Sequence, residues 1–151
     1  MRLLRMTVRQ RHQLSDLIVR PDGLEAVAVA LCGRQVGLDR TAYTVRSIIP
    51  IPIEACVRAV DSVRWPTRKI YDALDQCRGE DLAVLKLHSH PAGAAFFSTI
   101  DDASDCELLS AVARRIGGEQ LSAVITHDGQ ILARTVDAQG DFAPVDRIVV
   151  G

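Results

Sequence analysis

The sequence lacks several features that would place a protein in a broad class at once. No apolar run approaches the roughly 18 residues of a membrane span, and the arginine-rich start has no apolar signal-peptide core. The four cysteines form no Cys-x-x-Cys pair. A formal net charge of −1 and a pI near 6.4 provide no basic surface for nucleic acid or anionic membrane. We therefore expect a cytoplasmic protein with reduced thiols that binds neither nucleic acid nor membrane.

The composition indicates one folded domain. The chain has 151 residues, of which 48% are hydrophobic and 25% are charged, and it contains no internal repeat or low-complexity segment. This length is typical of a single domain with one core, and we assign it to residues 1–151. Residues 134–151 are interpreted as a loop and a final strand that form either a tail of the domain or the start of a linker to another domain.

Periodicity and turn residues predict an α/β fold. We expect strands at residues 2–8, 24–33, 42–55 and 81–90, a hairpin over residues 121–134, and helices at residues 9–19, 67–77 and 98–118. Residues 57–65 are ambiguous and include a possible short strand. The interleaving of strands and helices predicts a single three-layer domain, a mixed β-sheet flanked by helices.

The stretch "LKLHSHPAGAAFFSTIDD" at residues 85–102 contains a possible metal site. Side chains two apart on a strand share a face, so His88 and His90 point the same way before Pro91 and Gly93 turn the chain. Asp101 lies in the first turn of the following helix. Two histidines and one carboxylate leave a zinc ion one open position, as catalytic sites require.

A purely structural reading of the same stretch is a strand end and a capped helix. Ser98 followed by Asp101 has the form of a capping box, which needs no metal. The complete pattern His-x-His-x7-Ser-x2-Asp, however, is expected by chance in only about one of two thousand chains of this composition. The pattern as a whole therefore favours the metal site.

These residues resemble the JAMM (MPN-plus, or JAB) metalloprotease family. "HSHPAGAAFFSTID" fits the family pattern His-x-His-x7-Ser-x2-Asp, with its proline after the second histidine, at every fixed position. The resemblance implies one zinc ion per chain, bound by His88, His90 and Asp101, with Ser98 stabilising the oxyanion. It also implies the family's fold, which is related to cytidine deaminases. Deamination itself is disfavoured, because His-x-Glu and Pro-Cys-x-x-Cys elements are absent.

The family also needs a glutamate on an earlier strand, as the general base that takes a proton from the zinc-bound water. Glu25 opens the buried run "EAVAVALCG", which resembles the family's Glu-x-x-Gly-Leu-Leu-x-Gly strand. The chain departs from that pattern because Ala28 replaces a glycine and Gly33 falls one residue late. An exposed glutamate at a strand edge is the alternative interpretation of Glu25.

The resemblance implies a zinc-dependent isopeptidase or peptidase that cleaves the amide bond after the C-terminus of a ubiquitin-like protein, in deconjugation or precursor processing. The compact size resembles bacterial members that occur with E1-, E2- and ubiquitin-like proteins, including in antiphage operons. Those proteins are the expected partners. Residues 63–77 would be an insertion placed where a substrate protein could dock, with Trp65 either an anchor for that contact or part of the core under the next helix.

Three alternative functions remain open. The first is a peptidase that trims the tail of a sulfur-carrier protein. The second is a relative of bacterial JAB proteins associated with DNA repair, although these usually have a proline where Phe97 stands. The third is a noncatalytic docking module of a conjugation complex, which would tolerate the loss of Glu25.

Overall fold

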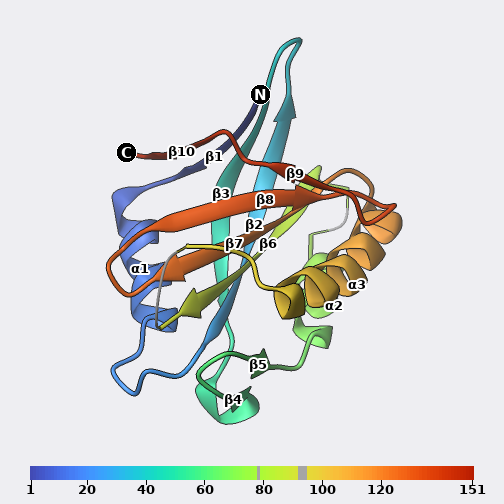
Figure 1. Ribbon diagram of the computed structural model, residues 1–151. Helices are drawn as coiled ribbons and strands as arrows, with labels where there is room; N and C mark the ends of the chain where they lie inside the picture. The colour runs from blue at the N-terminus through green and yellow to red at the C-terminus, as the bar shows by residue number, and fades with distance from the viewer. Residues whose placement is uncertain (78, 92–94) are drawn as a thin grey trace.

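A computed structural model describes residues 1–77, 79–91 and 95–151, so the turn expected at Gly93 lies outside the described residues. Within the described residues, eight strands form one curled, mixed sheet in the order β10-β1-β3-β2-β6-β7-β8-β9 (Figure 1). The strands are β1 (Arg2–Met6), β2 (Val27–Val36), β3 (Thr41–Pro50), β6 (Leu82–His90), β7 (Gln120–Thr126), β8 (Ile131–Val136), β9 (Phe142–Pro144) and β10 (Arg147–Val150).

In the part of the chain that the structure describes, three α-helices flank this sheet: α1 (Val8–Ile18), α2 (Arg68–Asp75) and α3 (Thr99–Ile116). Helix α1 begins where Thr7 and Gln10 form a reciprocal capping box, and α3 begins with a second such box at Ser98 and Asp101. Gly117 ends α3 with a positive φ of 85°, a conformation that favours glycine. The three expected helices are therefore present, with ends shifted by a few residues.

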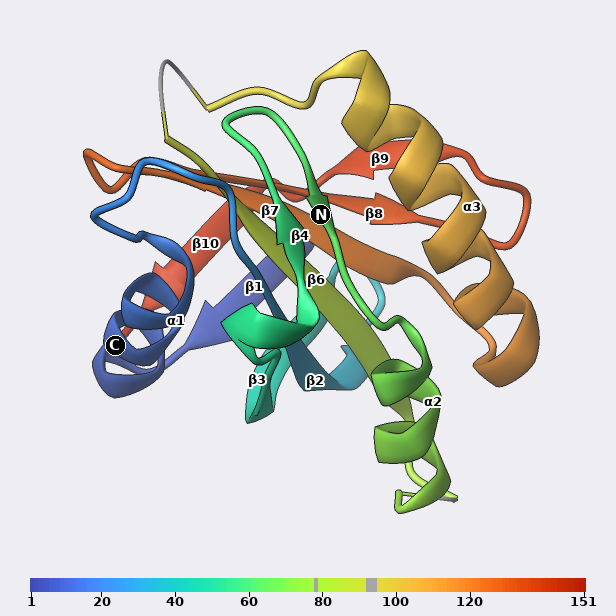
Figure 2. The ribbon, with the colours of Figure 1, turned by 90° about the horizontal axis from the view of Figure 1, so that it is seen from below.

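The helices cover opposite faces of the sheet, which confirms the three-layer α/β domain (Figure 2). On one face, Leu14 and Ile18 of α1 pack on small residues of the central strands, among them Ala28 and Ala30. On the other face, α2 and α3 pack on a second cluster that includes Val29. Because both faces are covered, β2 and β6 are apolar along most of their length, as buried strands are.

The C-terminal segment brings the two edges of the sheet together. Strand β9 pairs with β8, and after only two connecting residues β10 pairs in parallel with β1 at the other edge. Within that connection, the Val145 N–H donates to the Ala133 carbonyl and the Asp146 N–H donates to the Arg2 carbonyl. The sheet is consequently curled almost into a barrel, and residues 142–150 are part of it.

Residues 51–65 do not continue the strand that was expected over residues 42–55. That strand ends at Pro50, and a short 3-10 helix (Ile53–Ala55) follows. The ambiguous segment after it forms a separate two-stranded hairpin, β4 (Val57–Arg58) with β5 (Val63–Arg64). No helix among the described residues is both long and apolar enough to cross a bilayer.

Candidate metal centre

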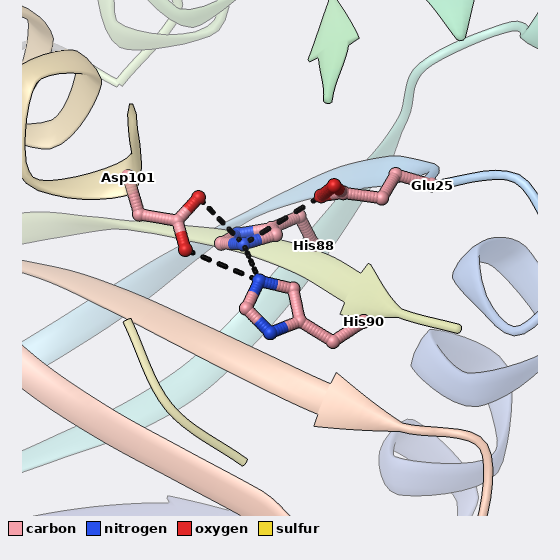
Figure 3. A group of neighbouring side chains, drawn as sticks. All are labelled: Glu25, His88, His90 and Asp101. Atoms are coloured by element: carbon pink, nitrogen blue, oxygen red, sulfur yellow. Dashed lines mark hydrogen bonds and ion pairs between the residues drawn. The ribbon is translucent and has the colours of Figure 1, made fainter. Parts of the chain in front are cut away.

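The candidate site lies where the end of β6, the start of β2 and the first turn of α3 meet. Strands β2 and β6 are antiparallel, with Val27 opposite His88, and the Ser89 N–H donates to the Ala26 carbonyl. This register places Glu25, which is 63 residues earlier in the chain, beside the two histidines. Figure 3 shows the four side chains that meet there: Glu25, His88, His90 and Asp101.

Three of these side chains converge on one point. The Nε2 atoms of His88 and His90 are 3.1 Å apart, and each lies 3.1 Å from a different carboxylate oxygen of Asp101. Ligand atoms about 2.0–2.1 Å from a tetrahedral ion lie about 3.3 Å from one another, so this triangle has nearly the required size. Two imidazoles and a carboxylate are also ligand types that zinc accepts. The side chains present therefore fit a metal ion.

The capping box of α3 fixes the orientation of Asp101. The Ser98 N–H donates to Asp101 Oδ2 over 2.8 Å, and the Asp101 N–H donates to Ser98 Oγ over 3.1 Å. Burial alone would raise the pKa of Asp101, but its hydrogen bond and charge interaction with His88, together with the Ser98 bonds, hold that pKa below its usual range. Asp101 is thus kept ionised, as a metal ligand must be.

Glu25 is held beside the triangle by its backbone. Its side chain is 3% exposed, with Oε1 3.8 Å from His88 Nε2. The Glu25 N–H donates to the Ala59 carbonyl, and Arg58 Nε donates to the Glu25 carbonyl over 2.8 Å. Arg58 also pairs with Asp22, so hairpin β4–β5 fixes the segment that carries Glu25. This burial excludes the alternative of an exposed glutamate at a strand edge.

The surroundings of Glu25 disfavour its charge. Burial, followed by the nearby carboxylates of Asp101 and Asp61, raises the pKa of Glu25 from an ordinary value of 4.5 to about 8. Burial also lowers the pKa of His90, with His88 contributing in the same direction. A carboxyl group with a pKa near neutrality, placed next to possible metal ligands, can exchange protons in hydrolysis.

The sequence comparison agrees with this geometry. The family model for prokaryotic homologs of the JAB domain matches residues 8–138. The chain belongs to that family. This JAB domain has the expected family fold and a buried Glu-His-His-Asp group that can hold a metal ion.

Known structures extend the comparison at the level of the fold. The solution structure of protein DSY2949 from Desulfitobacterium hafniense is similar to this JAB domain with a TM-score of 0.59 and 17% identity, over 98% of this chain and 92% of the other. At that identity the similarity shows a shared fold alone. A search of curated proteins finds no match.

The remaining expected residues lie in different places. Ser98 caps α3 at the edge of the site and lines a cavity together with Glu25 and His90. Trp65 is half-buried against the cluster beneath α2 and α3, and it lines a different cavity with Tyr71. The role of Trp65 in substrate docking stays a prediction.

Sequence reasoning did not find two arginines that support the site. Arg58 holds the backbone of Glu25, and Arg134 binds the first two turns of α3 through two aspartates. Both side chains are at most 10% exposed. Neither has a local motif, because their partners lie about 30 residues away in the chain.

Proposed function

We propose that this JAB domain is a zinc-dependent peptidase or isopeptidase that hydrolyses the amide bond after the C-terminus of a ubiquitin-like protein. The observation that carries the proposal is the convergence of three metal-ligand side chains beside a buried glutamate of raised pKa. Three protein ligands leave a tetrahedral ion one open position, which is typical of catalytic zinc. The choice of a ubiquitin-like substrate rests on the resemblance to JAMM proteases.

Each side chain has a distinct role in this mechanism. His88, His90 and Asp101 would hold the ion, which when bound would lower the pKa of a coordinated water and polarise the scissile carbonyl. Glu25 accepts the proton of the attacking water and passes it to the leaving amine. Because Ser98 Oγ uses a lone pair to cap α3, its hydroxyl hydrogen remains free to donate to the developing oxyanion.

The mouth of the site favours an extended chain over a bulky group. A cavity of about 110 Å³ opens beside Glu25 and His90, with the exposed apolar side chains of Val60 and Phe96 at its rim. Pockets for small molecules usually measure about 300–1,000 Å³. The smaller cavity suits a main chain with a small side chain next to the cleaved bond, such as the tail of a ubiquitin-like protein.

The proposed partners follow from this substrate. A protease that removes a ubiquitin-like protein acts on the products of E1- and E2-like enzymes, so we infer that such proteins work in the same cytoplasmic pathway. The apolar rim at Val60 and Phe96 is the surface that would meet the tail of the substrate.

Cleavage of defined fusions tests the proposal. We would use a ubiquitin-like protein extended by a linear peptide and the same protein joined to a lysine side chain. Wild-type protein should cleave at least one of the two, a chelator should stop cleavage, and zinc should restore it. Glu25→Gln should slow cleavage by about 10²–10⁴-fold. Glu54→Gln, at an exposed glutamate of the 3-10 helix, is the matched control and should retain full activity.

The outcomes separate the alternative functions. Preference for the lysine-linked substrate supports deconjugation, and preference for the linear fusion supports precursor processing or the trimming of a carrier tail. Cleavage that is indifferent to the chelator would contradict the mechanism. Stoichiometric zinc without cleavage of either fusion would favour a noncatalytic docking module.

A further inference from the structure

Arg134 of β8, whose side chain is buried, lies at the centre of a group of aromatic and acidic side chains next to the metal site. Its guanidinium is stacked between two aromatic rings, 3.8 Å from the ring centroid of Phe97 and 3.9 Å from that of Phe142. The same group donates to Asp102 over 2.6 Å and to Asp105 over 2.8 Å. One side chain therefore joins the segment before α3, the first two turns of α3, and β9.

Asp105 connects this cluster to the strand that carries the histidines. Its side chain is fully buried and accepts a hydrogen bond from Lys86 Nζ over 2.8 Å, in addition to that from Arg134. Lys86 is two residues before His88 on β6. Asp105 is one helical turn after Asp101, so both carboxylates project from the same face of α3 towards the sheet.

These contacts lead us to propose that Arg134 is a positioning residue for the metal site. Arg134 contacts Phe97, the residue before Ser98, and it binds Asp102 and Asp105, which follow Asp101 in α3. These contacts fix both ends of the segment that presents Ser98 and Asp101 to the site. A planar guanidinium can stack on rings and bind carboxylates at once, which a lysine cannot do. Removal of groups that orient metal ligands typically costs 10–100-fold in metal affinity.

The chain offers a matched control at the other end of the same helix. Arg34 of β2 donates to the carbonyls of Gly117 and Glu119 just after α3 and pairs with Asp81. Its side chain is 9% exposed, against 10% for Arg134. Arg34→Met therefore removes an arginine of similar burial from the end of α3 that carries no metal ligand.

The test is the zinc affinity of wild type, Arg134→Met, Arg134→Lys and Arg34→Met, measured by competition with a chromophoric chelator. We expect Arg134→Met to raise the dissociation constant for zinc by about 10–100-fold, Arg134→Lys to give an intermediate value, and Arg34→Met to match wild type. The visible spectrum of the Co²⁺-loaded protein, which reports ligand geometry, should change in Arg134→Met and not in Arg34→Met.

Phe97→Leu provides a second measurement that stays informative even when Arg134→Met does not fold. It removes only the stacked ring, and it should also weaken zinc binding. When Arg134→Met folds, the double variant Phe97→Leu/Arg134→Met should bind zinc no more weakly than Arg134→Met alone, because Phe97 acts through Arg134. Unchanged zinc affinity and an unchanged Co²⁺ spectrum in these variants would overturn the inference. The inference rests on the proposed zinc site, and wild-type protein that binds no zinc would overturn both.

Discussion

The raised pKa of Glu25 gives a quantitative prediction for the zinc-free protein. A carboxyl group with a pKa of about 8 when folded and 4.5 when unfolded binds its proton more tightly in the folded state. Its contribution to stability is therefore complete below pH 4.5 and is lost as the pH rises towards 8. The slope is at most about 1.4 kcal/mol per pH unit and falls off near both pKa values, so the loss between pH 5 and pH 8 is about 3.5 kcal/mol.

Glu25→Gln should abolish this pH-dependent loss of stability, because the amide has the shape of the carboxylic acid and does not ionise. Asp101 stays ionised over this range in both proteins and His90 is present in both, so the difference between wild type and variant isolates Glu25. The assay is urea unfolding in the presence of a chelator at several values from pH 5 to pH 8, followed by the fluorescence of Trp65, the single tryptophan. A difference in stability that stays constant over this range would refute the reasoning.

Variants at three further positions separate the roles of the groups around the site. Ser98→Ala should lower the free energy of unfolding by about 1 kcal/mol, because the helix cap is lost, and it should lower kcat by about 10²–10³-fold, because the oxyanion donor is lost. Ser98→Thr keeps a hydroxyl group and should retain most of the stability and most of the activity. Arg58→Met should lower kcat by about 10–100-fold by releasing the backbone of Glu25, and equilibrium dialysis should show unchanged zinc binding. Asp61→Asn should lower the pKa of Glu25 and move the acidic limb of the pH–rate profile to lower pH; an unmoved limb would contradict this.

The part of the site that local rules describe was predictable from the sequence. The two-residue period of a strand places His88 and His90 on one face, and a serine three residues before an aspartate marks the start of α3. The position of Glu25 was harder to derive, because it depends on the antiparallel register between β2 and β6. Only the resemblance to a known family singled it out before the structure.

The contacts that support the site were not predictable. Arg134 reaches Asp105 across 29 residues and Arg58 reaches Glu25 across 33, and neither pair follows a period of a helix or a strand. The curl of the sheet was not predictable either, because it also depends on contacts between distant parts of the chain. Strands β9 and β10 are short and separated by two residues, and the sequence contains no sign that they pair at opposite edges.

Metal analysis tests the central claim most directly. After dialysis against zinc and removal of the excess, we predict about one zinc ion per chain in wild type and in Glu25→Gln, and a large loss in His88→Ala and Asp101→Ala. Zinc retained in Glu25→Gln but lost in His88→Ala and Asp101→Ala would distinguish the metal ligands from the neighbouring general base. Wild-type protein without stoichiometric zinc, or Asp101→Ala with a full complement, would contradict the account.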